Sequence, residues 1–203
     1  MTVGTTLFDQ LIHHVLSKEF VTAACYHGYS KLVVQYGKGT LPNIGEFQWD
    51  ETDENGTRSG IFQSSSSSSV SLSWEVYRFK SSLRDDMTNA DLIISHAGAG
   101  SIMEGMEQCR SRMFEKDPEK GMKILVVVVN AALMDNHQSE LAEALERRGY
   151  LLMLRDPNHL VGNESIFEKI KTFEPQCFMG GDDSAFGTIL NTFIGNIDDK
   201  KRQ

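Results

Sequence analysis

Apolar positions in the first forty residues follow two different spacings. From Phe8 to Leu16 they return every three or four residues, the spacing of a helix with one buried face. Thr6 is a candidate cap for this helix. Residues 31–36 (KLVVQY) are instead a short run with β-branched side chains that ends in glycines, which predicts a strand. With residues 1–4 as the end of a strand and a tight turn, the segment predicts a parallel βαβ unit.

The alternation of strands and helices continues through the rest of the chain. Further strands are predicted at Trp74–Phe79, Asp91–Ser95, Lys123–Val129 and Leu151–Leu154. Further helices are predicted at Ser101–Cys109, Asn136–Arg148 and 186–194. Strands that alternate with helices predict an α/β fold, a Rossmann-like open parallel sheet with helices on both faces.

The length of 203 residues fits one domain, which we place at residues 1–203. Residues from about 41 to 73 break the rhythm with acidic residues, glycines and a run of serines at 64–69. Such a stretch buries too little apolar surface to offset the entropy of ordering it. We predict a disordered Ser-rich surface insertion at 41–73 and a second surface loop at 110–121.

Charge and composition exclude several classes of protein. The net charge is −8, which argues against nucleic-acid binding because phosphate backbones are held by clustered Lys and Arg. Three cysteines at wide spacing, with no C-x-x-C pair, fit a reducing compartment and give no metal site. The longest strongly apolar run, residues 124–129, is far shorter than the roughly 20 residues that span a bilayer. We expect a cytoplasmic protein that reaches a membrane only through a partner.

Two loops with glycines stand beyond the carboxyl ends of predicted strands, where open α/β sheets bind ligands. In the first loop, Gly4 lets backbone amides approach an anion, and Thr5 and Thr6 add hydroxyl groups at a helix start. A capped tight turn that binds nothing explains this short segment equally well.

The second loop has the sequence SHAGAGS. Gly98 and Gly100 free amide groups at a helix start for an anion, which the helix dipole also favours. Ser101 with Glu104 fits a capping box, which needs no ligand. His96 is open to two interpretations. It can belong to the ligand site, or it can simply donate to a backbone carbonyl, as a histidine after a buried strand often does.

The dinucleotide-binding pattern G-x-G-x-x-G is only half present in this loop. Met103 occupies the third glycine position, and Asn130 rather than an acidic residue follows the next strand. A P-loop sequence is absent as well. A dinucleotide-dependent enzyme is therefore a disfavoured alternative.

A third loop, residues 130–138 (NAALMDNHQ), gathers polar side chains at the start of a helix. Asp135 with Gln138 can cap that helix. Asn136, His137 and Gln138 in succession exceed what a cap needs, and amide and imidazole groups are suited to sugar hydroxyls. The segment predicts a ligand role.

Four segments in order resemble one known family. They are TVGTTLFDQLI (2–12), VVQYGKG (33–39), ADLIISHAGAGSIMEGM (90–106) and VVVVNAALMDNHQSELAEAL (126–145). The family is that of the catalytic subunit of the heterodimeric UDP-N-acetylglucosamine transferase of dolichol-linked oligosaccharide synthesis, a glycosyltransferase of the family 28 kind and one half of the GT-B type. The pair ISHAGAGS and LMDNHQ is far more specific than a lone glycine motif.

The resemblance implies an activity and its partners. The chain would transfer GlcNAc from UDP-GlcNAc to GlcNAc-diphosphodolichol on the cytosolic face of the endoplasmic reticulum. A membrane-anchored subunit would recruit it there, and neither a metal nor a cofactor would take part. Helix N-termini aimed at the diphosphate would stabilise the charge that develops as UDP leaves.

The resemblance also assigns site residues. Those that would face the diphosphate are Gly4, Thr5, Thr6, Gly98, Gly100 and Ser101. Glu104 would accept from the ribose hydroxyls, residues 136–138 (Asn136, His137, Gln138) would lie against GlcNAc, and the backbone near 77–79 is a looser candidate for the uracil.

Four expectations complete the sequence-based picture. The general base is His96 or a group on the partner, because a GT-B site lies between two domains. A non-catalytic nucleotide-sugar-binding subunit is the alternative from another functional class. The helix at 186–194 is a candidate docking element for the partner, and a helix packed on its own sheet explains its apolar face equally well. The family has a longer apolar strand before residues 2–6, so we expect this first strand to be clipped or its start to be missed.

Overall fold

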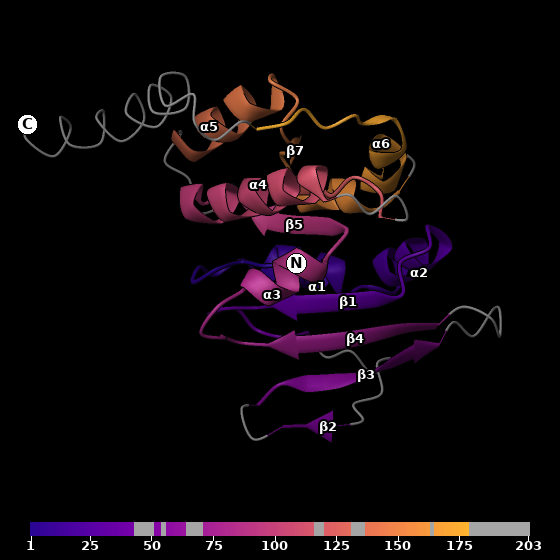
Figure 1. Cartoon of the computed structure of the whole chain (residues 1–203). Helices are drawn as coiled ribbons and strands as arrows, with labels where there is room; N and C mark the ends of the chain where they lie inside the picture. Colours follow the sequence, from indigo (N-terminus) through magenta and orange to yellow (C-terminus); the bar gives the residue numbers. More distant parts are fainter. Residues whose placement is uncertain are drawn as a thin grey trace, which may run out of the picture.

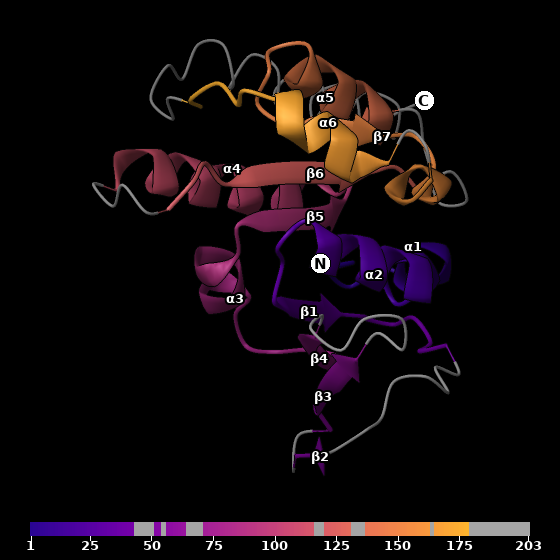
Figure 2. The same ribbon diagram turned by 90° about the vertical axis from the view of Figure 1, so that its right-hand side faces the viewer.

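The computed structural model describes residues 1–42, 51–53, 56–63, 71–115, 120–130, 137–162 and 165–178. Its strands are β1 (Lys31–Gln35), β2 (Glu51–Thr52), β3 (Arg58–Gln63), β4 (Ser71–Tyr77), β5 (Leu92–His96), β6 (Ile124–Val128) and β7 (Leu152–Leu154). They form two groups, in the orders β2-β3-β4-β1 and β5-β6-β7 (Figures 1 and 2). Thr2 pairs in parallel with both Gln35 and Ser95 and so joins the groups into one open sheet. All pairs are parallel except β2 with β3 and β3 with β4.

Helices cover both faces of this sheet, and Figure 2 shows α3 and α4 on one side with α1 and α2 on the other. The first layer holds α1 (Asp9–Val15), α2 (Lys18–Tyr26), the 3-10 turn η1 (Pro157–Leu160) and α6 (Ile166–Thr172). The second layer holds α3 (Arg84–Asn89), α4 (Ala99–Phe114) and α5 (His137–Glu146). The predicted α/β fold is confirmed. No helix in the described ranges is both long and apolar enough to cross a membrane.

Alternate residues of the central strands supply the two cores. Along β6, Val126 and Val128 enter the core beneath α1 and α2, while Leu125 and Val127 enter the core beneath α4 and α5. All four side chains are fully buried. Because both faces are covered, a central parallel strand is apolar at every position, and this is why β6 is so clear in the sequence.

Some predicted boundaries are wrong. The range 41–73, expected to be disordered, contains β2, β3 and the start of β4, because β3 pairs with β4 along its whole length. Residues 110–114, expected in a loop, belong to α4. Thr6 does not cap α1, since its hydroxyl donates to the carbonyl of Val3. The serine run at 64–69 and the predicted helix at 186–194 lie outside the described residues.

A cavity of about 540 Å³ interrupts the sheet at the amino ends of β1 and β5. Met1, Lys31–Val33 and Leu92–Ile94 line its walls within the sheet, and α2 and α3 contribute from the two helical layers. The ammonium group of Met1 lies at this cavity and donates to the carbonyl of Val33 over 2.7 Å. Burial lowers the pKa of this amine to about 6, and the charge of Asp86 acts in the opposite direction.

Candidate functional site

Four strand ends converge at the carboxyl edge of the sheet. The loop after Val3 crosses close to the loop after β1, because a methyl group on Gly37 would stand 2.5 Å from the carbonyl oxygen of Gly4. The loop after β6 joins them through Asn130, whose side-chain amide donates to the carbonyl of Leu7 over 3.0 Å. The loop after β5 completes the group. The structure therefore gathers the first two predicted ligand loops and the start of the third.

The first loop turns at Gly4 with a φ of +59°, a backbone conformation that favours glycine. A methyl group on Gly4 would lie 2.7 Å from Cε1 of His96 and 3.5 Å from the hydroxyl oxygen of Ser101. Three predicted site residues are thus immediate neighbours. Of the two threonines, Thr5 is exposed, whereas the hydroxyl of Thr6 donates to Val3 and holds the turn.

The two glycines of the second loop have different roles. Gly98 has an ordinary φ of −72°, but a methyl group there would lie 2.3 Å from Nε2 of His96. Gly98 is therefore needed for space rather than for conformation. Gly100 is exposed, and a methyl group there would meet nothing within 4 Å. It leaves the start of α4 open to an approaching ligand.

The 16-residue helix α4 begins at Ala99 with no side-chain cap. Its first intrahelical hydrogen bond runs from the amide of Ile102 to the carbonyl of Gly98, so the amides of residues 99–101 precede the bonded ladder. No acidic residue lies in the first turn. Such an end attracts an anion through its free N–H groups and its dipole.

The predicted capping box is wrong, because Ser101 is the third residue of α4 and not its N-cap. Glu104 therefore has no capping partner in Ser101. Its carboxylate is exposed one turn beyond Ser101, on the side of α4 that also carries Gly100. A carboxylate at this place is free to accept hydrogen bonds from a ligand held at the helix start.

His96 is buried at the centre of the site, with 8% of its surface exposed. Burial lowers the pKa of the imidazole, while the backbone of Thr2 acts in the opposite direction. Among the described residues, Nδ1 has no hydrogen-bond partner. Burial therefore favours the neutral form of the ring, which has one unprotonated nitrogen.

The loop after β4 forms the opposite flank. The Tyr77 hydroxyl donates to Asp86 over 2.5 Å, and burial, followed by this carboxylate, raises the pKa of the phenol. Arg78 donates to the carbonyl of Gly37 and places its guanidinium 4.9 Å from the ring centre of Tyr36. Phe79 is half exposed beside them.

The third predicted group is placed only in part. His137 and Gln138 begin α5, which shares a core with α4. Their side chains, and all of Asn136, lie outside the described residues. Their proposed contact with a sugar stays a prediction.

Sequence reasoning missed Gln35, a polar residue near the end of β1 with only 2% of its surface exposed. Its side chain bonds Thr2, Gly4 and Arg78. The available signal was one amide in an otherwise apolar strand that runs into a glycine loop. A buried amide of this kind requires partners.

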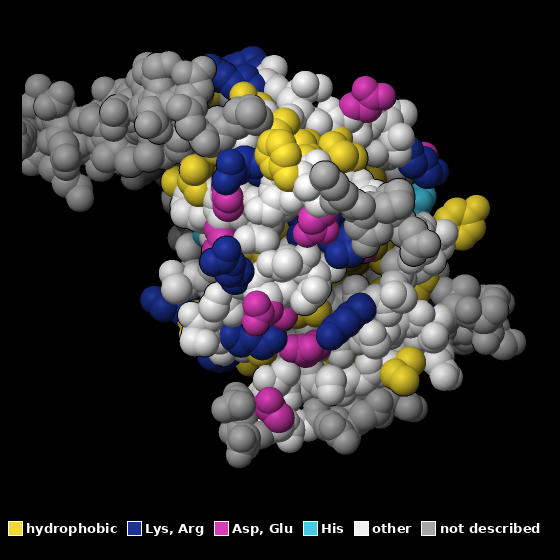
Figure 3. All heavy atoms as spheres, in the orientation of Figure 1, with side chains coloured by type: hydrophobic (Ala, Val, Ile, Leu, Met, Phe, Trp, Pro, Cys, Tyr) yellow, Lys and Arg dark blue, Asp and Glu magenta, His cyan; other side chains and the backbone are white. Residues whose placement is uncertain are grey.

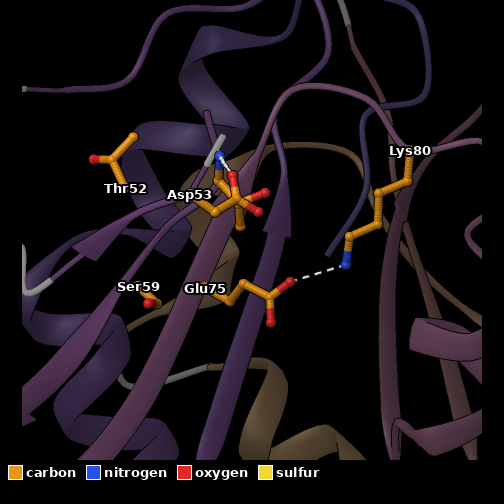
Figure 4. Close-up of a pocket in the computed structure, with 6 residues that line it drawn as sticks. Thr52, Asp53, Ser59, Glu75 and Lys80 are labelled. Atoms are coloured by element: carbon orange, nitrogen blue, oxygen red, sulfur yellow. Dashed lines mark hydrogen bonds and ion pairs between the residues drawn. The ribbon is translucent and has the colours of Figure 1, made fainter. Parts of the chain in front are cut away.

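A second pocket, of about 510 Å³, lies on the outer strands β2, β3 and β4, apart from the glycine loops (Figure 4). Glu75 and Lys80 form an ion pair of 2.8 Å at its wall. Acidic and basic side chains are interspersed on the face drawn in Figure 3. In the described part of the chain, no three His, Cys, Asp or Glu residues lie close enough to hold a metal ion.

Comparison with known proteins identifies the family. The model of the glycosyltransferase family 28 C-terminal domain matches residues 1–108. The UDP-N-acetylglucosamine transferase subunit ALG13 of Cryptococcus neoformans is 33% identical over 180 residues, which cover 85% of this chain and 81% of that protein.

Other relatives are longer or less alike in shape. The mouse protein of the same name is 39% identical over 189 residues, and the match spans only 13% of its length. A solution structure of ALG13 has 25% identity and a TM-score of 0.47, over 75% of this chain and 74% of that one. The chain therefore belongs to glycosyltransferase family 28, as a member of the family of UDP-N-acetylglucosamine transferase subunits.

Proposed function

We propose that this chain binds UDP-GlcNAc and transfers GlcNAc to GlcNAc-diphosphodolichol, together with a membrane-anchored partner subunit at the cytosolic face of the endoplasmic reticulum. The observation that carries the proposal is the uncapped start of α4 beside Gly4 and His96. The relatives that share most of this chain's length are named as subunits of a UDP-N-acetylglucosamine transferase, which supports both the donor and the need for a partner.

The donor lies along the carboxyl edge in this proposal. Its diphosphate sits against the amides of residues 99–101 and the loop at Gly4, and Glu104 accepts from the ribose hydroxyls. The uracil lies against the backbone of 77–79, and His137 and Gln138 contact GlcNAc. The start of α4 carries a fixed partial positive charge. Its attraction to the diphosphate grows as negative charge develops on the leaving UDP, so it lowers the energy of the transition state.

The acceptor oxygen attacks the anomeric carbon as the bond to UDP breaks, with inversion. The acceptor hydroxyl loses its proton to a base, for which the neutral ring of His96 is the candidate in this chain. The second source is a side chain of the partner. Replacing His96 with Gln separates these, because loss of transfer with donor affinity retained assigns the proton transfer to His96.

The proposal is tested first by calorimetry of the purified chain with UDP-GlcNAc, UDP-glucose and NADH. We expect UDP-GlcNAc to bind most tightly, and tighter binding of NADH would favour a dinucleotide enzyme. Transfer to GlcNAc-diphosphodolichol is then measured with and without the anchored subunit. Donor binding without transfer in the presence of that subunit would identify a non-catalytic binding subunit instead.

A further inference from the structure

We propose that Gln35 is a positioning residue for donor binding, one that fixes the diphosphate loop at Gly4 to the loop after β4. The inference rests on the proposed function and goes further, since it assigns the geometry of the site to a residue that touches no ligand. The side chain of Gln35 is almost fully buried between the two loops.

All hydrogen-bonding groups of the Gln35 amide have partners. Nε2 donates to the carbonyl of Gly4 over 2.7 Å and to the carbonyl of Arg78 over 2.9 Å. Oε1 accepts from the hydroxyl of Thr2 over 2.5 Å. That hydroxyl in turn accepts from the amide of Gly4 over 3.0 Å. The result is a closed network around the turn at Gly4.

The network connects the two ends of the proposed donor. Gly4 lies against His96 and Ser101, where the diphosphate would sit, and Arg78 lies in the segment assigned to the uracil. A carboxamide has two N–H donors and one carbonyl acceptor, which is the set that these partners require. Neither a carboxylate nor a thioether can donate to two carbonyls.

The strands themselves do not depend on this side chain. Residues 31–35 of β1 pair with residues 73–77 of β4 through the backbone, and the backbone of Gln35 pairs with Met1 and Val3. Removing the amide therefore leaves the ladder intact and releases the two loops. We expect a larger loss of donor binding than a general loss of stability would cause.

Gln108 provides a matched control. It is also a buried glutamine, on α4, and it accepts from the hydroxyl of Thr88 over 2.8 Å, away from both loops. We expect Gln35→Met to weaken UDP-GlcNAc binding by at least about tenfold, since it leaves buried carbonyls without a donor. Gln108→Met should change the affinity less than about twofold. Calorimetry of both variants, at a temperature where circular dichroism shows them folded, measures this difference.

A pH profile separates positioning from general destabilisation. In Gln35→Glu, burial raises the pKa of the introduced carboxyl, and only its protonated form can donate to a loop carbonyl. Its affinity for UDP-GlcNAc, relative to wild type, should therefore recover as the pH falls from 9 to 6. Gln108→Glu should show no such recovery. The pH profile of Gln35→Glu still tests the positioning role if Gln35→Met does not fold.

Hydrogen exchange tests the same inference in the protein without ligand. The amides of Gly4 and Thr6, which donate to Thr2 and Val3, should exchange at least about tenfold faster in Gln35→Met than in Gln108→Met. Unchanged exchange in Gln35→Met would overturn the role of Gln35. The same holds if Gln35→Met binds UDP-GlcNAc within twofold of wild type and Gln35→Glu shows no recovery at low pH. Failure of the wild-type chain to bind UDP-GlcNAc, with exchange changed as expected, would instead overturn the proposed function and leave the loop-fixing role in place.

Discussion

The two ends of the segment Met1–Val3 differ in how they are packed. At the carboxyl end, Thr2 and Gln35 form a closed set of hydrogen bonds, and Gly4 fits against His96 with no room for a methyl group. At the amino end, the same segment opens on a cavity of about 540 Å³ that receives a buried ammonium group. The comparison shows what fixes the loop at Gly4, namely a complete set of hydrogen bonds and a fit against His96 that leaves no space for a side chain.

The largest expected effect comes from adding one methyl group at the tight end. Gly98→Ala places Cβ against Nε2 of His96, so the ring or the start of α4 must move. We expect UDP-GlcNAc affinity to fall by about a hundredfold or more, because groups that contact the ligand are moved out of position. Calorimetry of wild type and Gly98→Ala with UDP-GlcNAc measures this change in affinity.

Gly100→Ala is a control for stability only, because its Cβ meets open space in the unbound protein, whereas the residue itself belongs to the proposed diphosphate site. Its free energy of unfolding should stay equal or rise by about 0.5–1 kcal/mol, since alanine favours a helix over glycine. If Gly98→Ala binds like wild type, the close packing at this end has no bearing on the ligand.

The second effect concerns the open end. In the 203-residue chain with a free amino group, the pKa of the Met1 amine is about 6 when folded, against 8.0 for an ordinary α-amino group. Between these pH values the unfolded chain binds more protons, so the free energy of unfolding rises with pH. We expect a gain of about 2 kcal/mol from pH 6 to pH 8, measured by urea denaturation.

Acetylation of the amino group is the control for this prediction. It removes the titrating charge, so the acetylated protein should lose that part of the pH dependence. Equal slopes in the two proteins would mean that the ammonium group is solvated in the folded state. The open end would then be wetter than the structure indicates.

The third effect concerns the proposed contact between Glu104 and the ribose at the start of α4. Glu104→Gln should weaken UDP-GlcNAc binding by about tenfold, because a neutral amide loses charge-assisted bonds to ribose hydroxyls. Stability should hardly change, since Glu104 is exposed and caps nothing.

Glu107→Gln, one turn further along α4, is the matched control. Glu107 is exposed and paired with Arg110, away from the helix start. Equal affinities of the two variants for UDP-GlcNAc would show that Glu104 does not contact the ribose.

The smallest effect concerns the sugar. Replacing His137 and Gln138 together with Ala should lower the affinity for UDP-GlcNAc about five- to tenfold and that for UDP hardly at all, because sugar contacts add discrimination. Calorimetry with both ligands gives the ratio. Equal losses would show that these residues do not read the sugar.

How far the sequence predicts the fold depends on whether a signal is local. β6 was predicted because both covered faces impose apolar residues at successive positions. β3 was missed because Arg58–Gln63 has a weak alternation and gains its pairing from β4. α2 was missed because its nine residues give only a short apolar stripe.

The site divides in the same way. The glycine loops were predicted from the sequence, whereas the start of α4 was placed two residues too late, because Ser101 and Glu104 fit a capping box while the N-cap is Gly98, which offers no side-chain signal. Gln35 was missed because its partners lie far away in sequence, at Gly4 and at Arg78. Local patterns cannot report such a network.

The bridge at Thr2 has a consequence for the order of folding. Residues 31–77 and 92–154 each supply one group of strands, and each group can form from contacts within its own stretch of chain. Thr2 must then find Gln35 and Ser95, one in each group, to close the sheet. The contact of Thr2 with Ser95 spans more of the chain than any strand pair within either group, so we expect the seam at Thr2 to close late. The loop at Gly4, which we propose holds the diphosphate, follows Thr2 directly, so in this order the proposed donor site takes shape only when the two groups of strands join.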